Sequence, residues 1–178
     1  MKHRFPAFVI ALCVLAAIAT HRSSAIQTAA PASVYLLKPA RVFDGEQLRE
    51  NWSVLVRGEK IEVVGDIKTP ADAKIIELPG ATLMPGLIEA HSHCLLHPYS
   101  ETPWNDQVAR EHLSLRVARA TNHLRDTLFA GFTTIRDLGT EGADYADVGL
   151  KQAVQQGIIP GPRMLIATRA IVVSGSYG

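Results

Sequence analysis

The sequence predicts an α/β fold in which a small unit of short β-strands precedes parallel β/α units. Two patterns predict it. Short apolar, β-branched runs separated by turn residues occupy the chain before Pro79-Gly80, and strand-like runs alternate with helical patterns after it. The composition agrees, because 47% of the 178 residues are hydrophobic and 20% are charged. Such a chain forms a packed core, which excludes disorder and a collagen-like structure.

The first 25 residues are predicted to be a secretory signal peptide. Lys2 and Arg4 precede an uncharged apolar run at 5–19, and small residues suited to cleavage follow it. The run is shorter than the roughly 20 residues that span a bilayer as a helix. We therefore expect a secreted or periplasmic protein with no membrane attachment after cleavage; an uncleaved anchor is the alternative. Cys13 would leave with the signal, and Cys94 alone cannot form an internal disulfide.

In the β unit, strands are predicted at 34–37, 40–43, 53–57, 61–64 and 74–78, with turns at residues such as Asp44-Gly45 and Gly65-Asp66. An apolar run at 81–90, interrupted by Pro85-Gly86, then ends at His91.

The alternating part begins with a helix predicted at 106–130. An apolar stripe runs along it, Asn105 is its expected N-cap and Gly131 its expected stop. A strand at 132–136, a helix at 143–156 and a strand at 163–167 complete the pattern of parallel β/α units. Three strands and two helices cannot cover both faces of a parallel sheet. We therefore expect the N-terminal part of something longer.

His91-Ser92-His93 is the strongest local signal for chemistry. Alternate side chains of a strand share a face, so the two imidazoles project together and can bind one metal ion through ring nitrogens. The pair ends an apolar strand that opens a β/α series, which in α/β barrels is the catalytic rim. Cys94 follows directly, and we interpret it as a small apolar residue near a strand end rather than as a ligand or nucleophile.

The stretch 83–93 (LMPGLIEAHSH) resembles the PGLIDxHxH signature that opens the barrel of amidohydrolase-superfamily enzymes. Upstream, 38–45 (KPARVFDG) and 54–65 (VLVRGEKIEVVG) resemble the strands of the small β-sandwich that precedes it. Downstream, 130–139 (AGFTTIRDLG) and 161–165 (GPRML) resemble the second and third barrel strands of the imidazolonepropionase-like and prolidase-like branch. Two positions depart from the pattern. Glu89 stands where the signature has Asp, and 174–178 (SGSYG) stands where many relatives carry a Gly-Gly-His-Gly turn.

The resemblance implies part of a β-sandwich at 34–80 and, at 81–178, the first three strands and two helices of a (β/α)8 TIM-type barrel. It implies His91 and His93 as ligands of one or two divalent ions, with Zn²⁺ the expected metal. The activity implied for the complete protein is hydrolysis of a C–N bond in a small amide or dipeptide-like substrate by metal-activated water. The family's remaining ligands would lie beyond Gly178, so no catalytic residue is assigned within the chain, which we expect to be inactive by itself.

The alternative is a truncated, non-catalytic relative used as a binding or interaction protein. Neither nucleic acid nor a nucleotide is an expected partner. The 18 Lys and Arg balance 17 Asp and Glu without a basic run beyond the N-terminus, and no G-x-G-x-x-G or G-x-x-x-x-G-K-[ST] motif occurs. The sequence leaves open the substrate, the number of metals and whether the protein forms a homo-oligomer.

Further candidates lie near the same rim. His97 and Tyr99, in the loop after the first barrel strand, are predicted substrate contacts. Arg136-Asp137 is interpreted as a structural ion pair that braces strand and loop. The remaining candidates have plainer interpretations: Arg169 and Tyr177 as contacts to a substrate carboxylate or as surface residues, and His112 and His123 as solvated or packed helix residues.

Overall fold

The computed structural model describes residues 32–177, so the predicted signal peptide at 1–25, with Cys13, lies outside the described residues. The described chain divides into two compact units, one of residues 32–38 and 53–77 and the other of residues 39–52 and 78–177. Within residues 32–177, no helix has the length and apolar character needed to cross a membrane.

A five-stranded sheet is built around β1 (Val34–Phe43). The other strands are β2 (Leu48–Glu50), β3 (Ser53–Arg57), β4 (Lys60–Gly65) and β5 (Lys74–Leu83), in the order β2-β1-β3-β4, with β5 also pairing β1. β1 is one strand where the sequence predicts two. Its first residues pair antiparallel with β3 and its last with β2, and Pro39, which has no N–H to donate, lies between these two ladders. The three-residue β2 is too short for its pattern to be predicted.

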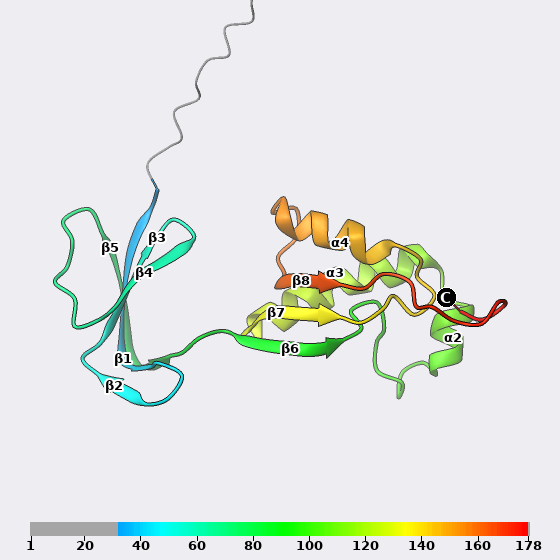
Figure 1. The fold of residues 1–178 in the computed structure, drawn as a ribbon, viewed down its shortest axis with the longest axis horizontal. Helices are drawn as coiled ribbons and strands as arrows, with labels where there is room; N and C mark the ends of the chain where they lie inside the picture. Colours follow the sequence, from blue (N-terminus) through cyan, green and yellow to red (C-terminus); the bar gives the residue numbers. More distant parts are fainter. Residues whose placement is uncertain (1–31, 178) are drawn as a thin grey trace, which may run out of the picture. The chain divides into compact units, whose positions relative to one another are not determined.

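The second sheet is parallel, as predicted, with the order β6-β7-β8. Its strands are β6 (Leu87–Ser92), β7 (Phe132–Asp137) and β8 (Arg163–Ile166). All three run in one direction, so their carboxyl ends lie at the same edge of the sheet (Figure 1). That edge carries the loops that follow each strand, including the loop that contains His93.

The region predicted as one helix at 106–130 forms two helices, α2 (Trp104–Ala109) and α3 (Leu113–Phe129). The chain breaks between them because His112 adopts an extended conformation as the N-cap of α3. The predicted Asn105 N-cap is wrong, since Pro103 caps α2. The Gly131 stop is confirmed: this glycine follows the helix with a φ of +97°, a conformation that favours glycine. The helix predicted at 143–156 is α4 (Ala146–Gln155).

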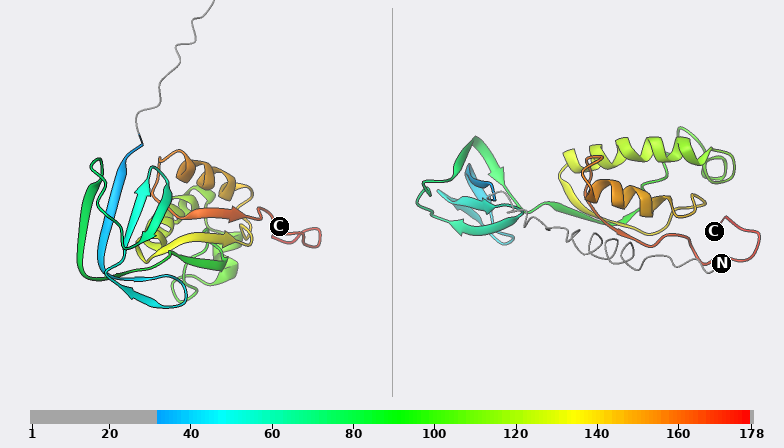
Figure 2. Two further views of the ribbon diagram at one scale, coloured as in Figure 1. Left: turned by 60° about the vertical axis from the view of Figure 1, so that its left-hand side comes forward. Right: turned by 90° about the horizontal axis from the view of Figure 1, so that it is seen from above.

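Both α3 and α4 pack on the same face of the parallel sheet (Figure 2). The core between them is apolar and includes Leu124 of α3, Leu150 of α4, Ile135 of β7 and Met164 of β8, each at most 3% exposed. The predicted apolar stripe is thus confirmed at its centre. The opposite face of the sheet has no cover within the described residues, and there Ile88 is 69% exposed and Leu165 is 53% exposed.

Candidate metal centre

The histidine pair lies at the carboxyl end of β6. His91 is on the strand and His93 follows it, with their ring centroids 5.4 Å apart in an edge-to-face arrangement. The ladder between β6 and β7 changes register between Glu89 and Ser92. In that irregular stretch, a Glu89 carboxylate oxygen accepts a hydrogen bond from the His91 backbone N–H at 2.9 Å. Two imidazoles thus lie side by side at the strand edge where parallel sheets carry their binding loops.

The His93 ring is held by a backbone carbonyl. Its Nδ1 lies 3.0 Å from the carbonyl oxygen of Gly139, in the loop after β7. A carbonyl can only accept, so Nδ1 carries a proton, and in the neutral imidazole it is then Nε2 that has the lone pair. Metal-binding histidines are oriented in this way, with the second ring nitrogen donating to a carbonyl or carboxylate. The chemistry of the donor set therefore fits a metal ion at His93 Nε2.

Other acidic groups are near, but they do not complete a set of ligands. A Glu141 carboxylate oxygen lies 3.9 Å from His93 Nδ1, and the other Glu141 oxygen accepts a hydrogen bond from Trp104 Nε1 at 3.1 Å. Within residues 32–177, no group of three or more His, Cys, Asp or Glu side chains is arranged to hold a metal. The described chain thus offers two histidine donors, fewer than the three protein ligands of a catalytic zinc site.

The loop after β6 is tightly bound to α2 and α3. His97 is buried, with its Nδ1 3.2 Å from a Glu101 oxygen and its Nε2 3.0 Å from a Glu111 oxygen. The Gln107 side chain accepts from the backbone N–H of His97 and donates to its carbonyl, both at 2.9 Å. Tyr99, by contrast, is 59% exposed. Both ring nitrogens of His97 therefore already have carboxylate neighbours, whereas the Tyr99 ring is accessible.

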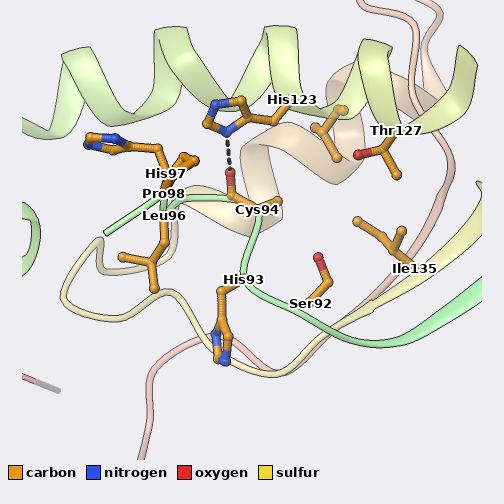
Figure 3. Close-up of a pocket in the computed structure, with 10 residues that line it drawn as sticks. Ser92, His93, Cys94, Leu96, His97, Pro98, His123, Thr127 and Ile135 are labelled. Carbon is orange, nitrogen blue, oxygen red and sulfur yellow. Dashed lines mark hydrogen bonds between the residues drawn. The ribbon is translucent and has the colours of Figure 1, made fainter. Parts of the chain in front are cut away.

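Two hollows adjoin His93. One is a cavity of about 210 Å³ between the end of β6 and α3, lined by Ser92, Cys94, His123 and Ile135 among others. Figure 3 shows the His93 ring pointing away from α3. His123 on α3 points toward Cys94, and its Nδ1 lies 3.4 Å from the Cys94 carbonyl oxygen. The second hollow is more open and is lined by His93, Leu96, His97, Pro98 and Tyr99. Both predicted substrate contacts therefore line a hollow together with His93.

Cys94 is buried, as its interpretation as a small apolar residue requires. Burial, together with the nearby Asp137 carboxylate, raises the pKa of its thiol far above the ordinary value. A thiol in this environment stays protonated and is a poor nucleophile or ligand.

The ion pair predicted between Arg136 and Asp137 is wrong, because these neighbouring strand residues point to opposite faces of the sheet. Arg136 is exposed and its Nε donates to the Ala90 carbonyl at 2.8 Å. Asp137 is completely buried and accepts from the backbone N–H groups of Cys94 and Gly139. Each residue does brace the strand ends, but through backbone groups.

A buried cation also joins two loops of this edge. Arg116 of α3 is 2% exposed, and its guanidinium donates to the carbonyls of Leu95 and Thr140 at 3.1 and 3.0 Å. Burial lowers the pKa of Arg116. Sequence reasoning missed this role, since an arginine beside an apolar stripe looks like a surface residue.

Arg169 and Tyr177, both after β8, have partners in the structure. Arg169 Nη1 lies 3.5 Å from an Asp144 carboxylate oxygen. Tyr177 packs edge-to-face on Trp104, with ring centroids 5.1 Å apart. Both contacts are compatible with a surface role as well as with a substrate contact, so both interpretations stay predictions.

The model of the amidohydrolase family matches residues 82–174, just over half of the chain. A search of curated proteins found no sequence that matches this chain. Among solved structures, the chain is similar to an amidohydrolase (30% identity, TM-score 0.66) and to a prolidase complexed with N-methylphosphonate-L-proline (33%, 0.66); each match covers 78% of this chain and 32% of the other. It is also similar to a Xaa-Pro dipeptidase with methionine bound in its active site, at 25% identity and a TM-score of 0.66. That match covers 78% of this chain and 34% of the dipeptidase chain. The chain thus spans about a third of the length of these structures.

Proposed function

Because the chain belongs to the amidohydrolase family, in its prolidase-like branch, we propose that it is the N-terminal part of a metal-dependent hydrolase acting on a C–N bond. The observation that carries the proposal is the hydrogen bond from His93 Nδ1 to the Gly139 carbonyl, which leaves Nε2 free to bind a metal. The substrate class we propose is a small amide or dipeptide-like molecule, in keeping with the prolidase and dipeptidase among the similar structures.

In this proposal, His91 and His93 hold one or two divalent ions, with Zn²⁺ the first choice for imidazole donors. A bound ion of this kind lowers the pKa of water and polarises a carbonyl group. The chain's own residues prepare the site: the Gly139 carbonyl fixes the tautomer of His93, and the Glu89 carboxylate ties the backbone at His91. The remaining ligands and the group that moves the proton are proposed to come from chain beyond Gly178.

Substrate contact is proposed for Tyr99 first. The residue is 59% exposed and lines the hollow that it shares with His93. His97 lines the same hollow, but its two ring nitrogens face Glu101 and Glu111. We therefore propose that His97 contacts substrate through its ring edge at most, and that its main contribution is to hold the loop that presents Tyr99.

The fold is proposed to be the first part of a (β/α)8 barrel at 81–178, preceded by part of a β-sandwich at 34–80. Supporting the barrel, the face of the parallel sheet opposite α3 and α4 exposes Ile88 and Leu165, whereas parallel sheets are normally covered on both faces. Export through the N-terminal signal at 1–25 is likewise a proposal, which rests on the basic start and apolar run of that segment.

The first experiment is the intact mass of the native protein from its source. A barrel of about 250 residues or more, with its sandwich, gives a mass far above the 19.3 kDa of this chain. A mass at or below 19.3 kDa would overturn the catalytic proposal and favour the truncated, non-catalytic relative.

The second experiment measures bound metal and hydrolysis of Xaa-Pro dipeptides and N-acyl amino acids by the full-length protein. His91→Ala and His93→Ala are expected to lose both metal and activity. His112→Ala, which removes an exposed histidine that caps α3, is the matched control and is expected to keep both. If loss of either His91 or His93 leaves metal content and activity unchanged, the proposed function is wrong.

A further inference from the structure

Asp137, the last residue of β7, is a fully buried carboxylate at the edge of the sheet that carries His93. Its Oδ2 atom accepts a hydrogen bond from the backbone N–H of Cys94 at 3.0 Å. Its Oδ1 atom accepts one from the backbone N–H of Gly139 at 3.1 Å. A buried carboxylate is costly unless its oxygens are satisfied, and here each oxygen has a backbone donor.

These two N–H groups belong to the two residues that position the His93 side chain, one through the backbone and one through a hydrogen bond to the ring. Cys94 follows His93 directly, so the bond to its N–H fixes the backbone from which the imidazole projects. Gly139 supplies the carbonyl that accepts from His93 Nδ1 at 3.0 Å, so the bond to its N–H fixes the group that orients the ring. The Asp137 carboxylate therefore fixes both the backbone next to His93, 43 residues away from it along the chain, and the residue whose carbonyl binds the His93 ring.

We propose that Asp137 is a positioning residue for His93, which sets the tautomer and direction of the imidazole so that Nε2 is presented for metal binding. The part that concerns metal rests on the proposed function; the part that concerns the tautomer does not. A carboxylate is required because both partners are donors. An amide has a single acceptor oxygen, so Asn at this position would turn its NH₂ group toward one of the two N–H groups.

Asp147 of α4 provides a matched control. It is also a fully buried carboxylate that accepts from two backbone N–H groups, those of Val148 and Thr168, each at 2.9 Å. Neither of these residues supplies the carbonyl that accepts from His93 Nδ1, which is that of Gly139. Thr168 acts one residue further along, where its carbonyl accepts from the N–H of Thr140. Asp137→Asn and Asp147→Asn thus remove comparable buried interactions, but only the first removes direct hydrogen bonds to Cys94 and Gly139.

The test uses the full-length protein with its metal removed, and ¹⁵N NMR of the imidazole to read the tautomer of His93. The Nδ1–H form is expected in the wild type and in Asp147→Asn, and a mixture with the Nε2–H form in Asp137→Asn. Cys94→Ala keeps the backbone N–H and is expected to behave as the wild type. The same variants are then titrated with Co²⁺, whose electronic spectrum reports its ligands. Asp137→Asn is expected to bind it about 10–100-fold more weakly and with an altered spectrum.

The outcomes separate the two proposals. If Asp137→Asn and Asp147→Asn lower the melting temperature alike and neither changes the tautomer of His93, Asp137 is only a structural residue and the inference is wrong. If the tautomer of His93 depends on Asp137 but neither the wild type nor any variant binds Co²⁺, the positioning role stands and the proposed metal function fails. Should Asp137→Asn not fold, hydrogen exchange of the wild type decides. Rapid exchange of the Cys94 or Gly139 amide in the folded protein would overturn the inference.

Discussion

Gly86, directly before β6, is expected to tolerate no side chain, because the neighbouring strand lies against it. A Cβ atom at this position would lie 2.1 Å from Oγ1, 2.2 Å from Cγ2 and 2.7 Å from Cβ of Thr133. The close approach arises from the ladder. Leu87 pairs with Phe132 and Ile88 with Thr134, so Thr133 is an extra residue on β7. Gly86→Ala therefore forces the start of β6 away from β7.

The magnitude follows from which atoms can move. Rotation of Thr133 about χ1 cannot clear both clashing positions, because its two γ atoms fill two of the three staggered positions. Its Cβ is also fixed to the backbone, and ordinary contact begins at 3.4 Å. The two backbones must then separate by roughly 0.7 Å to relieve the 2.7 Å contact. We expect Gly86→Ala to lower the free energy of unfolding by about 3 kcal/mol, at the top of the range for overpacking.

The assay is urea unfolding of the full-length protein, followed by circular dichroism, in a double-mutant cycle with Thr133→Gly. That substitution removes all three clashing atoms, at a cost of about 1 kcal/mol for a glycine within a strand. Gly86→Ala should then add little in the Thr133→Gly background, giving a coupling of about 3 kcal/mol. Thr133→Ala, which keeps the fixed Cβ, should rescue only in part. An unchanged penalty in the Thr133→Gly background would refute the reasoning, as would a cost of Gly86→Ala below about 0.5 kcal/mol.

Three further predictions follow from burial. Leu124→Ala should lower the free energy of unfolding by about 3 kcal/mol, because Leu124 is 1% exposed and lies in the core. Leu115→Ala on the same helix should change it by under about 0.5 kcal/mol, because Leu115 is 45% exposed. Equal costs of the two substitutions in urea unfolding would contradict this prediction. Cys94 should resist iodoacetamide at mildly alkaline pH until the protein unfolds, because burial and the Asp137 carboxylate raise the pKa of its thiol. Rapid labelling of Cys94 in the folded protein, read by peptide mapping, would contradict this prediction. Burial raises the pKa of Asp147 above its ordinary value of 3.8, so the folded state holds this proton more tightly than the unfolded state. Its contribution to the free energy of unfolding should therefore fall as pH rises above 3.8, and Asp147→Asn should remove this slope; the same slope in both proteins would show that other groups cause it.

The order of strands and helices could be predicted from the sequence because it depends on local patterns. The apolar stripe through Ala120 and Leu124 has the helical period, and Gly131 and Gly157 supply the positive φ angles that end α3 and α4. The parallel arrangement followed from the alternation of strand and helix. The His91 and His93 pair was visible for the same reason, since alternate residues of one strand share a face.

The break between α2 and α3 was not predictable from the stripe. The helix predicted at 106–130 includes residues 110–112, but the backbone leaves the helix there. Glu111, in that break, places a carboxylate oxygen 3.0 Å from His97, 14 residues earlier. A tertiary contact of this kind overrides local propensity, which is a weak determinant over a few residues.

Local patterns in the sequence specify the order of the elements, the core residues of α3 and α4 and the two histidines at the end of β6. How those histidines are held depends on contacts between distant segments. The Gly139 carbonyl that orients His93 and the Asp137 carboxylate that holds the two residues positioning its ring lie more than 40 residues away along the chain. Gly139 acts through a backbone carbonyl that every residue type carries, and Asp137 through a buried position that the sequence suggested was one half of an ion pair with Arg136. Because such contacts depend on which strands become neighbours, no local pattern encodes them, and the folded sheet is needed to bring them together.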